Sequence, residues 1–472
     1  MGEKKSSAFA AGIGYTIGNM LIKGIGILTL PLFSRIMTTE EFGVYNVFAA
    51  YDAILFVIIG LALHTSVRSA NLEFRGKIDD YVSSISLIYI FNLLVFWLLT
   101  LLFGDMLSKI LGLQTTMLFI LVIYSFSSAV LTLYNTWISL NYDYKKYLII
   151  SVINTVGNVV VSLVLILTIF RNQRDVGRIV GSTVVLVVLT IYLLVFMFRK
   201  AKPRVDIQYW HFGLKYSLPI VPHGVSQVLL AQFDRIMIRN IINASAAGIY
   251  SLAGNIKIIL TVITASISTA WNTWFFNEMD KQNKSNIRKR AVQLVALFAI
   301  LAVGLMAISP ELIFVLGGKE YDMAKYVAIP MVIDGFILFM YDLIASGEYY
   351  KKKTTYIMCG TIVAAVLNVV LNYIYIHKYG FVAAAYTTLI SYICYLLMHL
   401  FICRKLLGFY ILPVKWLVLF GSIVIGAAVV DLFFINNLIA RWSICALVVI
   451  PMAFVLMCSY QGKNIKALLK KR

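Results

Sequence analysis

Long apolar runs recur along this 472-residue chain, and they constrain its fold more than any single motif does. Each run is roughly 18 to 25 residues long, which is the length that a helix needs to cross a bilayer. Short polar loops separate the runs, and this pattern is typical of spanning helices rather than of barrel strands. Because 61% of the residues are hydrophobic and only 13% are charged, a soluble globular chain is excluded. The sequence predicts an all-α polytopic membrane protein with about fourteen transmembrane helices.

The first run, Ala8 to Phe33, resembles a signal peptide in position, but it is too long and carries Lys23 in its middle. We therefore expect it to stay as the first span. The predicted spans begin near Ala8, Gly43, Tyr81, Thr116, Leu148, Ile179, Gly213, Gly248, Ala291, Ala324, Tyr356, Phe381, Trp416 and Trp442.

The formal net charge of +20 arises from basic residues that cluster in every second loop. This distribution indicates loops that stay on the cytoplasmic side of the membrane, and it argues against a nucleic-acid partner. The basic clusters include Lys145 and Lys146, Lys351 to Lys353, and the tail Lys463 to Arg472. Both termini are predicted to be cytoplasmic, in a multi-pass protein of the bacterial inner membrane.

Enzyme-like patterns are missing from the sequence. Its five cysteines all lie in the last third, and they are predicted to be reduced packing residues. The spacing of Cys and His residues does not fit a metal site, and no nucleophile–base motif is recognisable. We expect no enzyme activity, no metal and no cofactor.

An internal echo divides the chain. The segment Ser34–Asn46 is repeated about two hundred residues later by Asp234–Met237 followed by Ala247–Ser251. A second echo relates Asn154–Gly181 to Asn368–Ala385. An offset of six spans keeps both halves in the same orientation, so the echo predicts two parallel-repeat lobes of six helices around a central cavity.

The echo also sorts the buried ionisable residues into matched pairs, because it places Lys23 opposite His223 and Asp52 opposite Lys257. An intramembrane charge needs a partner or a watery cavity, so these four are candidate substrate-binding residues. Arg68 and Arg235 are candidates for the same role, although each also fits an interfacial anchor. The alternative for the first group is a structural ion pair, for instance Lys23 with Asp52.

Further positions suggest motion and proton transfer. Pro219, Pro222 and Gly224 lie within one span and predict a helix break that serves as a hinge. Candidate proton carriers are Asp52, His64, His223, Asp334 and Asp342, each of which also fits a structural hydrogen bond.

The chain resembles the polysaccharide transporter family, the O-unit and capsular repeat-unit flippases of the multidrug, oligosaccharidyl-lipid and polysaccharide exporter superfamily. The resemblance rests on the segments Leu30–Met37, Glu41–Tyr45, Gly60–Arg68, Tyr216–Pro222, Asp234–Met237 and Gly380–Ser391, in this order. It implies an N-terminal lobe at residues 1–200, a C-terminal lobe at 201–403, and two additional spans with a basic tail at 404–472.

The resemblance also implies a function, namely flipping a polyprenyl-pyrophosphate-linked oligosaccharide repeat unit from the cytoplasmic to the outer leaflet. Its partners would be the lipid bilayer, the lipid-linked glycan, a polysaccharide polymerase and a chain-length regulator. Three alternatives stay open: a lipid II-type flippase, a cation-coupled multidrug exporter, and a non-transporting scaffold for glycan assembly. The arginine-rich first helix of lipid II flippases is replaced here by Gly24, Gly26 and a single Lys23.

Overall fold

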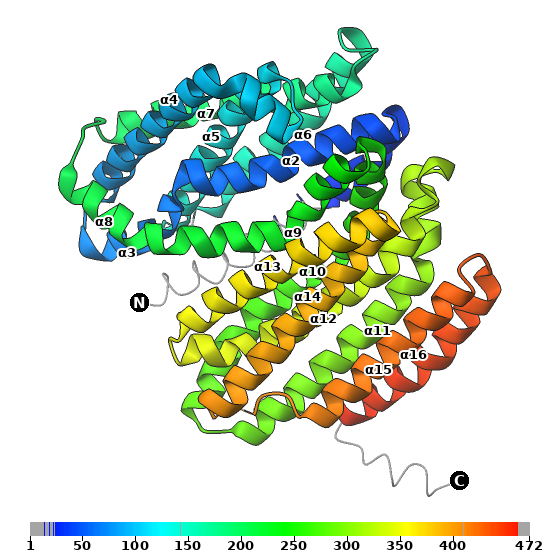
Figure 1. The fold of residues 1–472 in the computed structure, drawn as a ribbon. Helices are drawn as coiled ribbons and strands as arrows, with labels where there is room; N and C mark the ends of the chain where they lie inside the picture. Colours follow the sequence, from blue (N-terminus) through cyan, green and yellow to red (C-terminus); the bar gives the residue numbers. More distant parts are fainter. Residues whose placement is uncertain are drawn as a thin grey trace, which may run out of the picture. The chain divides into compact units, whose positions relative to one another are not determined.

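The computed structural model describes residues 24–141, 143–408 and 410–460, together with positions 14, 18 and 22. In this described part every regular element is a helix (Figure 1). Twelve of the described helices are long and apolar enough to cross a membrane. They are α2 (Thr39–Gly60), α4 (Ile78–Leu111), α5 (Thr115–Ser139), α6 (Tyr144–Thr168), α7 (Arg174–Lys200), α10 (Ala244–Asp280), α11 (Lys284–Gly317), α12 (Ala324–Tyr350), α13 (Thr354–Tyr379), α14 (Val382–Phe401), α15 (Val414–Phe433) and α16 (Leu438–Tyr460). The all-helical polytopic fold predicted from the apolar runs is confirmed.

Two further segments complete the predicted set of about fourteen spans. The helix Gly24–Ile36 is the described part of the first apolar run. The span expected near Gly213 is a broken helix, made of α8 (Ile207–Ser217), the 3₁₀ turn η2 (Leu218–Ile220) and α9 (Val221–Ile241). Its prolines explain the break, because Pro219 and Pro222 lack the N–H groups that would continue the helical hydrogen bonds.

By packing, the chain forms two compact units, Met1–Gly248 and Ile249–Arg472. Within the first unit α2 packs on α5 and α9, and α6 lies along α7. Within the second unit α12 packs on α11 and α14, and α13 lies along α14. These units follow packing alone, so the repeat-based boundaries near residues 200 and 403 stay a prediction.

Two glycines allow the first turns of α2 and α10 to cross closely. A methyl group on Gly43 would lie 1.8 Å from the carbonyl oxygen of Ala244, and a methyl on Gly248 would lie 2.1 Å from that of Thr39. Thr39 Oγ1 and Ser245 Oγ add a hydrogen bond of 2.7 Å. Thr39 precedes Gly43 by the same spacing as Ala244 precedes Gly248, so the two segments exchange equivalent contacts, as a local two-fold axis requires. This reciprocity supports the internal echo that aligns the two glycines.

Polar side chains join α13 to α14 in the interior of the second unit. Asn368 Nδ2 donates to Thr388 Oγ1 at 2.8 Å, and Asn372 Nδ2 donates to Asn368 Oδ1 at 3.2 Å. Thr387, the residue before Thr388 on α14, donates to Asn372 Oδ1. All four side chains are buried, and the network supplies the partners that lipid could not.

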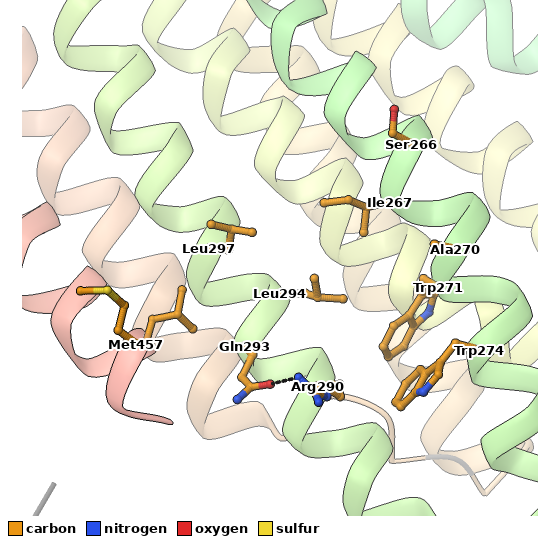
Figure 2. A pocket seen from close by; sticks show the side chains of 11 residues that line it. Ser266, Ile267, Ala270, Trp271, Trp274, Arg290, Gln293, Leu294, Leu297 and Met457 are labelled. Atoms are coloured by element: carbon orange, nitrogen blue, oxygen red, sulfur yellow. Dashed lines mark hydrogen bonds between the residues drawn. The ribbon is translucent and has the colours of Figure 1, made fainter. Parts of the chain in front are cut away.

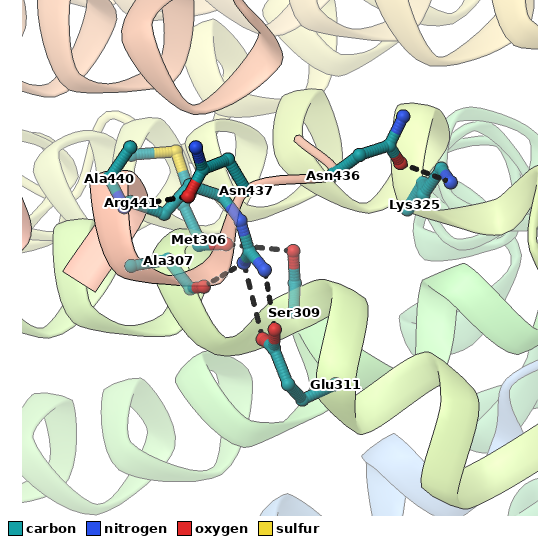
Figure 3. A network of polar contacts seen from close by, with 9 residues as sticks. All are labelled: Met306, Ala307, Ser309, Glu311, Lys325, Asn436, Asn437, Ala440 and Arg441. Atoms are coloured by element: carbon teal, nitrogen blue, oxygen red, sulfur yellow. Dashed lines mark hydrogen bonds and ion pairs between the residues drawn. The ribbon is translucent and has the colours of Figure 1, made fainter. Parts of the chain in front are cut away.

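A buried arginine attaches α16 to α11 (Figure 3). Pro310 interrupts α11 and removes the donor for the Met306 carbonyl, which instead accepts a hydrogen bond of 2.8 Å from Ser309 Oγ. Close to this interruption Arg441, which is only 2% exposed, pairs with both carboxylate oxygens of Glu311. A charged group at this position is tolerated because Glu311 and the backbone carbonyl of Ala307 accept its N–H groups.

We predict that Gly43→Ala and Gly248→Ala each destabilise the protein by about 1–3 kcal/mol or more, because the added methyl meets backbone that cannot rotate away. The midpoint of thermal unfolding of the purified protein measures this. The matched control is Gly426→Ala on α15, whose methyl would meet no atom within 4 Å. In a helix interior alanine is favoured over glycine by up to about 1 kcal/mol, so the control should equal or exceed the wild type. Three equal midpoints would contradict the close crossing.

Candidate functional site

The charged pair Lys257–Asp334 lies in the interior of the second unit, where α10, α12 and α14 meet. Lys257 Nζ is 3.7 Å from Asp334 Oδ2 and 4.9 Å from the centre of the Tyr392 ring. The Asp334 side chain is 1% exposed, whereas that of Lys257 is 20% exposed. The lysine therefore compensates a buried carboxylate and still reaches an accessible surface.

A second polar group links α10 to α12. Trp271 Nε1 donates to Ser346 Oγ at 2.9 Å, and Ser346 Oγ donates to Asn272 Oδ1 at 2.8 Å. Ser268 Oγ donates to Asp342 Oδ2 at 2.8 Å. Asp342 is thus held by a hydroxyl group, and the indole of Trp271 is fixed in orientation with its ring beside that of Trp274.

These indoles form one wall of a cavity of about 820 Å³ between α10, α11 and α16 (Figure 2). Most of the lining is apolar, and the polar exceptions are Ser266, Arg290 and Gln293. Arg290 Nη1 donates to Gln293 Oε1 at 3.3 Å, at the end of the cavity where the tryptophans lie. The full lining comprises Ser266, Ile267, Ala270, Trp271, Trp274, Arg290, Gln293, Leu294, Leu297, Leu456 and Met457.

A neighbouring cavity of about 530 Å³ lies between α11, α15 and α16. It shares Gln293 and Leu456 with the first cavity, so we treat the two as one groove. Arg288 and Lys289 line the second part, next to Arg290 in the first. The groove is therefore apolar along its length and basic at one end, which suits an apolar chain that carries an anionic group.

In the first unit Asp52 projects from α2 toward α5. Its Oδ1 accepts a hydrogen bond of 2.7 Å from Ser125 Oγ. A second ionisable group of this unit is Arg178 on α7, which is 9% exposed. Its guanidinium carbon lies 3.5 Å from the ring centre of Phe33 and 4.9 Å from that of Tyr45, so the charge is stabilised by aromatic faces.

His64 and Arg68 follow an unusual turn at the end of α2. Leu61 and Ala62 both have positive φ angles, 45° and 49°, which non-glycine residues rarely adopt. The turn leads into a 3₁₀ segment that carries His64, whose ring centre lies 5.9 Å from that of Phe56. Arg68 lies on the short helix α3 (Val67–Glu73) with an exposed side chain. Strained backbone of this kind is common at functional sites.

The remaining candidates lie on or near α9. His223 is in its first turn, half-buried, and its Nδ1 has no hydrogen-bond partner in the described part of the chain. Arg235 donates to Gln232 one turn earlier. Gly224 faces α2, where an added methyl would lie 3.2 Å from Val57 Cγ1. Lys23 lies outside the described residues.

The structure therefore brings Lys257 together with Asp334, a counter-ion that sequence reasoning had considered only as a proton carrier. The predicted meeting of Lys23, Asp52, His223 and Lys257 in one cleft stays a prediction. Sequence reasoning missed several buried ionisable groups, among them Arg178, Arg441 and the pair Glu348–His399. For His399 the signal was its position inside an apolar run.

Comparisons with known proteins identify the family and the fold of the chain. The family model described as polysaccharide biosynthesis protein matches residues 9–279, more than half of the chain, and the MatE model matches residues 219–374. The Lsg locus putative protein 1 of Haemophilus influenzae is 23% identical over 376 residues, covering 76% of this chain and 89% of the relative. The probable low-salt glycan biosynthesis flippase Agl15 of Haloferax volcanii is 21% identical over 188 residues, covering 39% of this chain and 40% of the relative.

Two solved structures share the fold. One is a lipid II flippase MurJ in an inward closed conformation, with a TM-score of 0.76, 16% identity and coverage of 95% of this chain and 98% of that structure. The other is an inward-facing multidrug resistance MATE family transporter, with a TM-score of 0.64, 13% identity and coverage of 84% and 95%. At these identities the likeness concerns the fold alone.

We predict that Lys257→Gln destabilises the protein more than Asp334→Asn does. Lys257→Gln removes the counter-ion of a carboxylate that is 1% exposed, at a cost of about 3 kcal/mol, whereas Asp334→Asn leaves a lysine whose side chain is 20% exposed, at a cost of about 1 kcal/mol. Protonation of Asp334 would relieve the first cost, so the loss in Lys257→Gln should shrink as the pH falls. Unfolding midpoints measured across pH test this. Lys146→Gln, which breaks an exposed pair with Asp143, is the control. Equal, pH-independent losses would contradict it.

Proposed function

We propose a transport function for this chain, which belongs to the polysaccharide biosynthesis protein family: it moves a lipid-linked glycan across the bacterial inner membrane. The cargo is an oligosaccharide repeat unit on polyprenyl pyrophosphate, and the direction is from the cytoplasmic to the outer leaflet. The observation that carries this proposal is the groove of the second unit, because it combines an apolar length with a basic end.

The chemistry of such a cargo explains why both properties are needed. A pyrophosphate with an attached glycan cannot cross hydrocarbon unaided, because its charges and hydroxyl groups would lose their hydration. A polyprenyl chain, in contrast, is as apolar as the bilayer. In the proposed complex the groove holds part of that chain, while Arg288, Lys289 and Arg290 interact with the phosphates. Trp274 offers a flat ring on which a sugar can stack.

The distribution of basic residues supports the proposed direction. Arg288, Lys289 and Arg290 close the basic stretch from Lys281 to Arg290, which the positive-inside rule assigns to the cytoplasmic side. The basic end of the groove would then open toward the leaflet in which the cargo is assembled. Transport by alternating access follows, with the broken helix α8–η2–α9 as the hinge.

Three other functions are ranked below this one. A lipid II-type flippase has the same fold and would also carry an anionic polyprenyl lipid. A multidrug exporter of organic cations is disfavoured by the basic groove, because like charges repel. A scaffold for glycan assembly, beside a polymerase and a chain-length regulator, would need no groove.

A deletion strain separates these functions. We expect it to accumulate a polyprenyl-pyrophosphate-linked oligosaccharide in the inner leaflet and to lose surface polysaccharide. Accumulation of lipid II would favour the lipid II-type flippase. Unchanged lipid intermediates with altered drug sensitivity would favour the multidrug exporter. The lipid fraction of spheroplasts, analysed by mass spectrometry, provides the measurement.

We predict that Ala270→Trp, which fills the cavity beside Trp271 and Trp274, abolishes most of the export that a plasmid copy restores to this strain. A matched control is Ala446→Trp on α16, at an exposed position that does not line the groove. The control should restore export fully at the same abundance in the membrane. Full export by Ala270→Trp would remove the groove from the proposed mechanism.

A further inference from the structure

A completely buried carboxylate–imidazole pair lies near the end of α12, outside the residues that line the groove. Glu348 Oε1 is 2.6 Å from His399 Nδ1, and both side chains are 0% exposed. Cys403 Sγ, from the π-helical turn η4 (Ile402–Leu406), lies 3.7 Å from the same Oε1. The second carboxylate oxygen, Glu348 Oε2, and the second ring nitrogen, His399 Nε2, have no hydrogen-bond partner among the described residues. Unsatisfied polar atoms at this depth are rare and require an explanation.

The surroundings supply no other compensating cation. No described lysine or arginine forms an ion pair with Glu348, and the ring of His399 packs edge-on against Tyr341 at 4.9 Å and Tyr395 at 4.6 Å. Tyr349, on the same helix, is the remaining titratable neighbour that interacts with Glu348 electrostatically.

The helix α13 approaches the pair from the other side without charge. An added methyl at Gly360 would lie 2.5 Å from His399 Nε2, so the imidazole rests directly against that helix. The neighbouring hydroxyl of Thr361 is engaged with Tyr395 at 3.0 Å. Within the described part of the chain, His399 is therefore the basic group that pairs with this carboxylate.

Proton counting then defines what this pair can do. With one shared proton it is neutral overall, either as carboxylate and imidazolium or as carboxylic acid and imidazole. Loss of that proton leaves a net negative charge in a site without a lysine or arginine, and gain of a second leaves a net positive charge. While α12 and α14 stay packed together, the neutral form with one proton is therefore the favoured one. Release of that proton requires the interface of α12 with α14 to open toward water.

The pair also lies on the same face of α12 as the candidate site. Asp334, Tyr341 and Glu348 follow one another at seven-residue intervals, which places Glu348 about 21 Å along the helix from Asp334. Tyr341 and Tyr395 stand between them with ring centres 4.3 Å apart.

We propose that Glu348 and His399 form a proton-binding site that is loaded when the interface of α12 with α14 is closed and unloaded when it opens. Coupling of this proton to cargo movement rests on the proposed transport function, but proton binding itself does not.

Infrared difference spectroscopy of the full-length protein in lipid vesicles, titrated over about pH 5 to 8, tests the proposal without any glycan. We expect a pH-dependent band of a protonated carboxyl group in the wild type and its loss in Glu348→Gln, which keeps a hydrogen-bond acceptor for His399. Asp322→Asn, which removes an exposed carboxylate paired with Lys325, is the control and should keep the band. An unchanged difference spectrum in Glu348→Gln would overturn the proposal.

A second measurement uses the wild type, in case Glu348→Gln does not fold. The chain has five histidines, so ¹⁵N-histidine NMR can follow each imidazole once His399 is assigned by its loss in His399→Gln. We expect the His399 nitrogens to change protonation over the same range. A single, pH-independent protonation form would mean that the pair is only a structural hydrogen bond.

Discussion

The hydrocarbon interior of a membrane contains no water, so every polar group buried there must find its partner within the protein. This constraint explains why the described elements are helices and why so many of their contacts are polar. Asn368 and Asn372 connect α13 to α14, and Arg441 with Glu311 connects α16 to α11. The same rule makes each buried charge informative. Burying a charge costs free energy, and charged residues within membrane spans are usually functional.

Three polar sites in the second unit differ in what their surroundings allow them to do. Arg441 pairs with Glu311 and donates to the Ala307 carbonyl near a proline, so its role is structural. The Lys257–Asp334 pair is 20% exposed on the lysine side, so a ligand can reach the ammonium group. The groove combines apolar walls with the basic residues Arg288, Lys289 and Arg290. An apolar surface beside cationic side chains suits an anionic lipid better than an organic cation.

The lengths of the apolar runs predicted the helices well, because a run long enough to span a bilayer has few other stable conformations. The break at Pro219 and Pro222 was also predictable, since proline removes a backbone donor wherever it occurs. Contacts between distant helices were not. That Lys257 meets Asp334, or Glu348 meets His399, depends on how α10, α12 and α14 pack, and a single sequence carries no record of such pairing. The groove likewise exists only where α10, α11, α15 and α16 converge.

The proposed function is the transfer of an anionic polyprenyl-linked glycan between leaflets. The most direct test reconstitutes the purified protein in vesicles with a fluorescent polyprenyl-pyrophosphate oligosaccharide and measures how much of it a membrane-impermeant quencher can reach over time. We expect nearly all of the fluorescent lipid to become accessible to the quencher with the wild-type protein. Without protein, only the outer-leaflet fraction should be accessible to it. Equal accessibility with and without protein, alongside uptake of a cationic dye by the same vesicles, would contradict it.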